Sequence, residues 1–177
     1  MSLFAILKYP DPFLKTVAQP VDKVDAEVKK LISDMIDTMY GARGIGLAAV
    51  QVGVARRVIV LDVPDDDEEK RERGRNLIAL VNPVITASEG TMVYEEGCLS
   101  VPGYTADVTR AERIAVRALN SEGEHIELEA EGLPAIAIQH EIDHLDGTLF
   151  IDRISRLKRE LIKRKIKKAL EAEQWAL

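Results

Sequence analysis

Hydrophobic residues recur at helical spacing between Asp25 and Tyr40. The apolar positions are Val28, Leu31, Ile32, Met35, Ile36 and Met39. This spacing places them on one face of a helix. Asp22 or Asp25 can act as the N-cap, and Gly41 follows the last apolar position. The pattern therefore predicts an amphipathic helix over 25–40.

Short runs rich in β-forming residues fill the middle of the chain, after a glycine-rich segment at 41–53. The runs are 58–63, 77–81, 91–94, 104–108, 114–119 and 125–130. Turn residues separate them, so each run predicts one strand. The segment 120–123, with Asn120 and Gly123, predicts a hairpin turn between the last two strands.

Helical spacing returns in the last third of the chain. Apolar residues interleave with polar ones over 133–145, and Gly147 stands just after the end. A further helix is predicted over 155–172. Its apolar stripe consists of Leu157, Leu161, Ile162, Ile166 and Leu170. The order helix, strands, helix, helix favours an α+β fold over alternating βαβ units.

Length and composition favour a single soluble domain spanning residues 1–177. The chain is 46% apolar and 31% charged, which is typical of a globular protein. No apolar run approaches the roughly 20 residues of a membrane helix. The opening segment 1–12 also lacks the pattern of a signal peptide, so we expect a cytoplasmic protein with no membrane partner.

Acidic and basic residues are segregated along the chain. The net charge of −6 argues against a protein that coats nucleic acid, and no DNA partner is expected. An acidic cluster, Asp65, Asp66, Asp67, Glu68 and Glu69, indicates a solvated loop within 62–75. The segment 153–168 is instead dominated by lysine and arginine.

Two histidines in the predicted helix 133–145 can bind one metal ion together. His140 and His144 are four residues apart, so on a helix they share a face. Glu141 directly follows the first histidine, as in metal-dependent hydrolases whose glutamate moves protons without binding the metal. Asp143 and Asp146 do not share this face and are assigned to helix polarity or the surface. A charged helix with ordinary histidines is the alternative interpretation.

The best candidate for a third metal ligand is Cys98. The acidic residues after His144 lie in the basic terminal helix, where surface ion pairs are expected. Cys98 is the only cysteine, so it has no disulfide partner within the chain and is free, reactive or a ligand. One thiolate and two imidazoles suit Zn²⁺, Fe²⁺, Co²⁺ or Ni²⁺ better than Mg²⁺ or Ca²⁺. Taken alone, Cys98 would more readily be interpreted as a small buried hydrophobic residue.

Three segments together resemble the signature motifs of the peptide deformylase family. They read Gly44-Ile-Gly-Leu-Ala-Ala-Val-Gln51, Glu96-Gly-Cys-Leu-Ser100 and Gln139-His-Glu-Ile-Asp-His-Leu145, in the family's order. The resemblance covers nearly the whole chain. It implies antiparallel or mixed sheets packed around a central metal-binding helix, with an N-terminal and a C-terminal helix.

The resemblance also implies a reaction and its residues. The enzyme would hydrolyse the formyl group from the formylmethionine of nascent polypeptides. Cys98, His140 and His144 would bind one divalent ion, Fe²⁺ in the cell, with Zn²⁺, Ni²⁺ or Co²⁺ as substitutes. Glu141 would act as general acid and base. Gln51 and the backbone N–H of Leu99 would stabilise the oxyanion.

Substrate-binding positions follow from the same resemblance. The backbone of Ile45 and Gly46 would pair with the peptide as an added strand, and Gly97 belongs to the same group. Ile45, Leu133, Ile136 and Ala137 would line a pocket for the methionine side chain. The chain differs from residues common in the family at Val50, Thr105 and Ala137.

The basic terminal helix suggests a partner that carries negative charge. Its cationic residues are Arg153, Arg156, Lys158, Arg159, Lys163, Arg164, Lys165, Lys167 and Lys168. They could contact ribosomal RNA where formylated chains emerge, as the resemblance encourages. A solvated helix face explains them equally well. The formyl substrate implies a bacterial protein, with an organellar one as the alternative.

Other classes of hydrolase and a non-enzymatic protein remain as alternatives. A His-Glu-x-x-His metalloprotease would cut internal peptide bonds and take its third ligand after His144. A Cys-His hydrolase would use Cys98 as its nucleophile and would not need a metal. A structural metal site or peptide-binding module would have no role for Glu141 or for an open coordination position.

Overall fold

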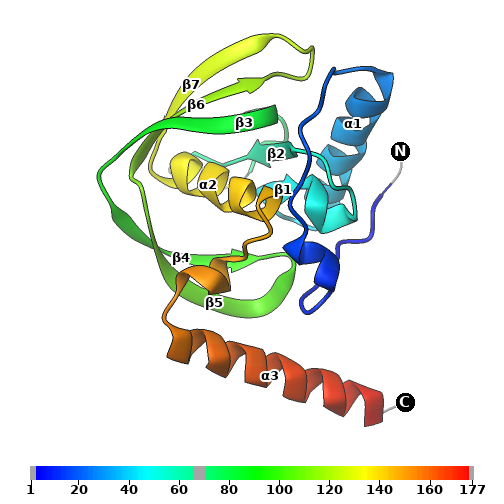
Figure 1. The fold of residues 1–177 in the computed structure, drawn as a ribbon, viewed down its shortest axis with the longest axis vertical. Coiled ribbons are helices and arrows are strands. Elements are labelled where there is room, and N and C mark those ends of the chain that lie inside the picture. The colour runs from blue at the N-terminus through cyan, green and yellow to red at the C-terminus, as the bar shows by residue number, and fades with distance from the viewer. Residues whose placement is uncertain (1–2, 66–70, 176–177) are drawn as a thin grey trace.

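Helix α2 (Leu133–Leu145) runs through the centre of the molecule, between a five-stranded and a two-stranded sheet (Figure 1). The structure is a computed structural model that describes residues 3–65 and 71–175. It confirms the predicted α+β fold, with both sheets antiparallel and the histidine-bearing helix in the middle. Of the predicted acidic loop, Asp65 is exposed, whereas 66–69 lie outside the described residues.

The larger sheet gathers strands from both halves of the chain. Its order is β1 (Gly46–Ala48), β2 (Val58–Asp62), β3 (Leu77–Glu89), β6 (Arg113–Leu119) and β7 (His125–Glu131). The smaller sheet consists of β4 (Met92–Cys98) and β5 (Val101–Arg110). Within the larger sheet β1 lies at one edge and pairs only with β2, so its other edge is open for pairing.

Strand β3 is much longer than the predicted run 77–81. The sequence suggests a break at Asn82 and Pro83, but the strand continues to Glu89 with a register shift between Val81 and Val84. Asn82 has φ 54°, and its side-chain amide bonds both the N–H and the carbonyl of Val21. The turn residues therefore form a bulge, which bends the strand without ending it. Strands β4 and β5 also extend beyond their predicted runs.

Helix α1 (Ala26–Gly41) lies within one residue of its predicted bounds at each end. Of the two candidate caps, Asp25 is the one used, because its side chain accepts a hydrogen bond from Val28 N at 3.0 Å. The helix buries Met35 and Met39 in one core cluster with residues of β2. Short 3₁₀-helices occur at η1 (Pro12–Lys15), η2 (Ala49–Val52) and η3 (Phe150–Arg153).

Long-range hydrogen bonds hold α2 at its middle and at its C-terminal end. In the middle of the helix, the Gln139 amide donates to Ala111 O at 2.9 Å and accepts from Ala111 N at 3.1 Å. At the end, Leu145 O accepts from Ala18 N at 2.8 Å and from the Arg57 guanidinium at 3.1 Å. These bonds satisfy polar groups in a buried environment and fix the helix that carries both histidines.

Helix α3 (Arg156–Trp175) lies along the outside of the molecule beyond the β4–β5 sheet (Figure 1). Ile166 is buried and Ile162 packs with it, but Leu157, Leu161 and Leu170 of the predicted stripe are exposed. The middle of that stripe is therefore the part that is buried against the domain. Among the residues described, no helix is both long and apolar enough to cross a membrane.

Candidate metal centre

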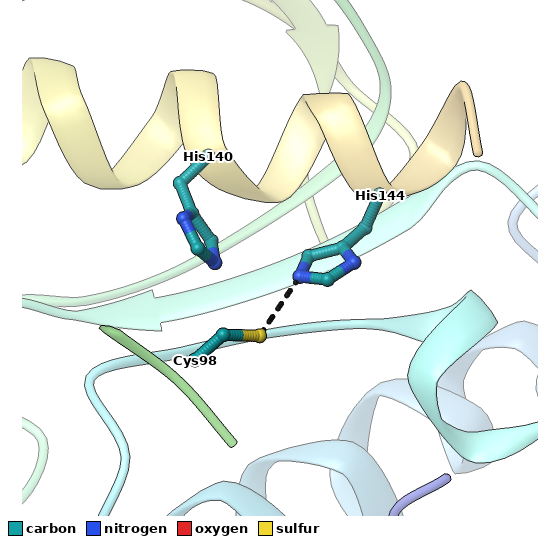
Figure 2. A group of neighbouring side chains, drawn as sticks. All are labelled: Cys98, His140 and His144. Carbon is teal, nitrogen blue, oxygen red and sulfur yellow. Dashed lines mark hydrogen bonds between the residues drawn. The ribbon is translucent and has the colours of Figure 1, made fainter. Parts of the chain in front are cut away.

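Cys98, His140 and His144 come together as the sequence predicts. Both imidazoles project from one face of α2 toward Cys98 at the end of β4 (Figure 2). The three possible ligand atoms all lie within 4.8 Å of one another, and Cys98 Sγ is 3.3 Å from His144 Nε2. An ion bonded at about 2.0–2.3 Å to tetrahedral ligands needs them roughly 3.3–3.8 Å apart. The donor set and its convergence thus fit one divalent ion of the Zn²⁺ or Fe²⁺ type.

The surroundings of the two imidazoles differ. Burial lowers the pKa of His144 well below its ordinary value, which favours the neutral form that a metal ligand needs. Burial also acts to lower the pKa of His140, but polar contacts with Cys98 and Glu96 and the nearby Glu141 raise it well above the ordinary value. The neighbours that favour a proton on His140 equally favour a metal cation at this position.

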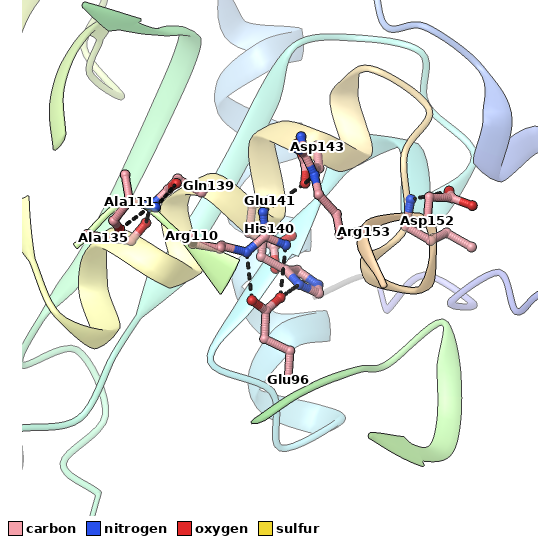
Figure 3. Close-up of polar contacts among 11 residues, drawn as sticks. Glu96, Arg110, Ala111, Ala135, Gln139, His140, Glu141, Asp143, Asp152 and Arg153 are labelled. Atoms are coloured by element: carbon pink, nitrogen blue, oxygen red, sulfur yellow. Dashed lines mark hydrogen bonds and ion pairs between the residues drawn. The ribbon is translucent and has the colours of Figure 1, made fainter. Parts of the chain in front are cut away.

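A buried ionic network, which the sequence did not reveal, supports His140 (Figure 3). Glu96 is 4% exposed, and its Oε1 lies 2.8 Å from His140 Nδ1. Arg110 donates to both oxygens of Glu96, at 2.6 and 2.9 Å. Burial acts to raise the pKa of Glu96, but its hydrogen bonds to His140 and Arg110 hold the pKa below the ordinary value. An ionised Glu96 would fix the orientation and tautomer of the His140 ring.

Asp143 extends this network and is not a surface residue. It is 7% exposed, accepts from Arg110 at 2.8 Å, and is paired with Arg153 of η3 at 2.6 and 2.9 Å. The surface interpretation of Asp143 is therefore wrong, because two arginines distant in sequence compensate its burial. Asp146 is exposed and pairs with Arg57 at 3.0 Å. Of the network, Glu96 and Asp143 lie in two of the three motifs, whereas Arg110 and Arg153 carry no local signal.

Glu141 is buried beside the candidate ligands and close to β1. Burial raises the pKa of Glu141 to about 7, and its Oε2 has no hydrogen-bond partner among the described residues. A Cβ added at Gly46 would lie 2.8 Å from Glu141 Oε1, so the close approach of β1 to this carboxyl requires glycine. A carboxyl with a pKa near neutrality suits both acceptance and return of a proton.

Gln51 directs its side-chain amide into the same region. Its Oε1 accepts from Ala48 N at 3.0 Å, while Nε2 donates to Ser100 Oγ at 3.0 Å and lies 3.6 Å from Cys98 Sγ. The orientation of the amide is thereby fixed with its donor nitrogen beside the cysteine. Leu99 stands between Cys98 and Ser100, in the tight connection from β4 to β5.

A cavity of about 520 Å³ opens beside these residues. All the predicted substrate-binding residues line it: Ile45, Gly46, Gly97, Leu133, Ile136 and Ala137. Gln51, Cys98, Leu99, His140 and Glu141 line it as well. Apolar walls next to a few convergent polar groups are typical of a small-molecule or peptide-binding site.

Comparisons with known proteins agree with this geometry. The sequence profile of the family described as polypeptide deformylase matches residues 3–160. The chain belongs to the polypeptide deformylase family. The peptide deformylase of Neisseria meningitidis serogroup B is 54% identical over 168 residues, covering 95% of this chain and 96% of that protein. That of Phenylobacterium zucineum is 53% identical, covering 97% of this chain and 99% of that protein.

Solved deformylase structures share the fold over nearly the full length. The crystal structure from Legionella pneumophila superposes with a TM-score of 0.86 at 45% identity, covering 98% of each chain. The deformylase of Ehrlichia chaffeensis in complex with actinonin gives a TM-score of 0.87 at 41% identity, covering 96% of this chain and 98% of that one. Deformylases are metal-dependent, and the Cys98, His140 and His144 cluster is the matching feature here.

The deformylase family assignment does not favour the metalloprotease alternative. A protease of that type would take a third ligand from the chain after His144. In residues 3–65 and 71–175 the cluster able to hold an ion contains Cys98, which precedes the helix, and no residue after His144. The geometry thus differs from the protease pattern in the origin of its third ligand.

Proposed function

We propose that this chain removes the formyl group from the N-terminal formylmethionine of nascent polypeptides and releases formate. The observation that carries the proposal is the convergence of Cys98, His140, His144 and Glu141 beside an apolar cavity, in a chain of the deformylase family. The expected products are formate and a peptide with a free α-amine.

Cys98, His140 and His144 are the proposed ligands of one divalent ion. We propose Fe²⁺ in the cell, with Zn²⁺, Ni²⁺ or Co²⁺ as functional substitutes, because one thiolate and two imidazoles suit all four. When bound, the ion supplies Lewis acidity that polarises the formyl carbonyl and makes water nucleophilic near neutral pH. Glu96 keeps His140 oriented through its contact with Nδ1.

Glu141 moves the proton in this proposal. Its buried carboxyl, with a pKa of about 7, accepts a proton from the attacking water and returns it to the nitrogen of the departing amine. The free Oε2 supports this role, because an oxygen without a hydrogen-bond partner is available to water or substrate.

Gln51 Nε2 and the Leu99 backbone N–H are the proposed donors to the developing oxyanion. The Gln51 amide is held by Ala48 and Ser100, so little reorientation is needed when charge develops. Loss of one such donor costs roughly 10²–10³ in kcat in comparable sites.

The open edge of β1 is the proposed docking site for the peptide backbone. A substrate strand would pair with Ile45 and Gly46 on one side and lie near Gly97 on the other, since all three line the cavity. The methionine side chain would enter between Ile45, Leu133, Ile136 and Ala137. Backbone pairing would allow varied sequences after methionine, because main-chain hydrogen bonds do not depend on side-chain identity.

Formate release from formyl-Met-Ala-Ser, with and without a chelator, tests the proposed reaction. Anaerobically purified protein should release formate, and the Glu141→Ala variant should lose roughly 10²–10⁴ in kcat while keeping its metal. Chelation should abolish release, and addition of Fe²⁺ or Ni²⁺ should restore it. Release that resists chelation would favour a Cys98 nucleophile, and no release from folded, metal-loaded protein would overturn the proposal.

Contact with the ribosome is a further part of the proposed function. Helix α3 lies on the outside of the molecule (Figure 1). Its residues Arg164, Lys165 and Lys168 are exposed. Ribosomal RNA would be attracted to this charge, placing the enzyme near emerging chains in the cytoplasm. We further propose that residues 1–177 act as one catalytic domain.

Cosedimentation with ribosomes tests the contact. Binding should weaken with rising salt, and the triple charge reversal R164E, K165E and K168E should reduce it at least tenfold. The triple variant should deformylate the free tripeptide normally. Absence of binding, or binding indifferent to salt, would contradict this part of the proposal.

A further inference from the structure

Arg71 joins three separate segments beside the proposed peptide-binding edge. Its Nη1 donates to Gly44 O at 2.6 Å, and its Nη2 donates to Asp62 O at 3.1 Å. The guanidinium also lies 5.0 Å from the centroid of the Tyr40 ring. Arg71 thus connects the end of α1, the segment before β1 and the end of β2 with the planar fork that only arginine provides.

Several contacts fix the segment that carries Arg71. The Tyr40 hydroxyl and the Asp62 carboxylate are hydrogen-bonded to each other, and Gly74 N donates to both, at 3.0 and 2.9 Å. Arg73 lies 4.4 Å from the centroid of the same Tyr40 ring and pairs with Asp37 at 2.9 Å. Residues 71–74 are therefore anchored on α1 and β2, so Arg71 acts from a fixed position.

The carbonyl that Arg71 holds belongs to a constrained segment at the edge of the cavity. Arg43 has φ 59°, unusual for a residue with a side chain, and Gly44 N donates back to Met39 O at 2.9 Å. A Cβ at Gly44 would lie 2.6 Å from Leu99 Cδ1, so this backbone packs closely against the segment after Cys98. Gly44 and Ile45 both line the cavity, and Ile45 O accepts from Asp62 N at 2.9 Å.

We propose that Arg71 is a positioning residue that holds the peptide-docking edge of β1 in its binding conformation. By fixing the Gly44 carbonyl it sets the spacing between Ile45–Gly46 and the facing Gly97, where the substrate backbone would lie. This inference rests on the proposed deformylase function. Arg71 should govern affinity for the peptide beyond methionine, because its hydrogen bonds go to the backbone of Gly44 and Asp62 at the docking edge.

The length of the substrate separates this role from a general contribution to folding. Formyl-Met-Ala-Ser extends along the docking edge, whereas formyl-methioninamide occupies little more than the methionine pocket. A loosened edge should weaken binding of the long substrate selectively, because fewer backbone pairs depend on it in the short one. A merely destabilised protein would lose activity toward both substrates in parallel.

Steady-state kinetics of Arg71→Ala with both substrates test the proposal. KM for formyl-Met-Ala-Ser should rise about five- to tenfold, in line with the net contribution of one ordinary hydrogen bond, with kcat within about twofold of the parent. KM for formyl-methioninamide should change less than about twofold. Arg113→Ala is the matched control, since Arg113 is an exposed arginine paired only with Glu131 among the described residues.

A milder variant guards against misfolding. Arg71→Lys keeps the charge but cannot bond both carbonyls with one ammonium, so it should give an intermediate rise in KM for the long substrate alone. If Arg71→Ala does not fold, the difference in KM between the long and the short substrate is measured with Arg71→Lys and tests the proposal instead. Equal losses on both substrates, or no change on either, would overturn the proposal. Failure of the parent enzyme to release formate from either substrate would instead contradict the proposed function.

Discussion

Helices α2 and α3 follow each other in the chain and both carry many polar side chains, yet their environments are opposite. Ten residues of α2 are buried, from Ala135 through Leu145, including the four charged or ionisable side chains His140, Glu141, Asp143 and His144. Helix α3 exposes most of its lysines, arginines and glutamates, with Ile166 buried. Both helices carry ionisable side chains. They differ in whether those side chains are buried, as on α2, or exposed to solvent, as on α3.

The carboxyl groups of α2 and α3 differ in their partners and in their exposure to solvent. Asp143 is paired with two arginines, whereas Glu141 remains with a pKa of about 7. On α3, Glu160 is exposed and its nitrogen–oxygen distance to Arg159 is 3.9 Å. A buried carboxyl thus becomes a fixed ion where arginines surround it and has a raised pKa where they do not, whereas an exposed one stays solvated.

Removal of a histidine from α2 should have the largest effect. His144→Ala should lower formate release at least 10³-fold and should abolish stoichiometric metal binding, because only two ligands remain. Metal analysis of the purified variant alongside kinetic assays measures both effects. His125→Ala is the matched control, since His125 is exposed on β7, and it should behave like the parent. Retention of metal by the His144 variant would contradict the assigned ligand set.

Removal of the buried, ion-paired carboxylate of Asp143 on α2 should cost more stability than removal of an exposed carboxylate on α3. Asp143→Ala leaves Arg110 with only Glu96 as an anionic partner and should lower the free energy of unfolding by about 3–5 kcal/mol. Glu160→Ala should change it by less than about 1 kcal/mol. Urea denaturation of metal-free protein measures both values. Similar values for the two variants would remove the distinction between the helices.

Because the pKa of Glu141 is raised, the free energy of unfolding should depend on pH. In the folded, metal-free protein burial raises the pKa to about 7 from an ordinary value of 4.5, so folding takes up a proton between these values. Stability should therefore fall as the pH rises from about 4.5 to 7, and the loss should be complete above 7. Glu141→Gln should relieve on the order of 3 kcal/mol at pH 8 and almost nothing at pH 4.

Urea denaturation of parent and variant across this pH range measures the relief. Glu160→Gln is the matched control, because that carboxylate is exposed on α3. A relief by Glu141→Gln that does not grow with pH would show that the carboxyl is not held with a raised pKa.

The smallest expected effect separates the two sides of α3 itself. Ile166→Ala should lower the free energy of unfolding by about 2 kcal/mol, because the side chain is buried against the domain. Leu161→Ala should change it by less than about 0.5 kcal/mol, since Leu161 is 44% exposed. Thermal denaturation monitored by circular dichroism distinguishes them. Equal effects would indicate that the exposed leucines are buried in solution.

Structural features that depend on residues close together in the sequence can be predicted from the sequence alone. The ends of α1 and α2 follow from apolar spacing, the Asp25 cap and the residues beyond the last turn, because these interactions span at most four residues. The motifs around Gln51, Cys98 and His140 also indicated which side chains would meet. Their assigned roles remain predictions, although the structure places them around one cavity.

The sequence by itself determined the helices, the strand-forming runs, the candidate ligands and the family. Only the tertiary structure decided that Asn82 and Pro83 form a bulge, that Asp143 is buried between Arg110 and Arg153, and that Arg71 holds the Gly44 carbonyl. The physical reason is distance along the chain. A helix period or a cap is a local interaction, whereas a buried charge or a bent strand depends on partners that folding brings from elsewhere in the sequence.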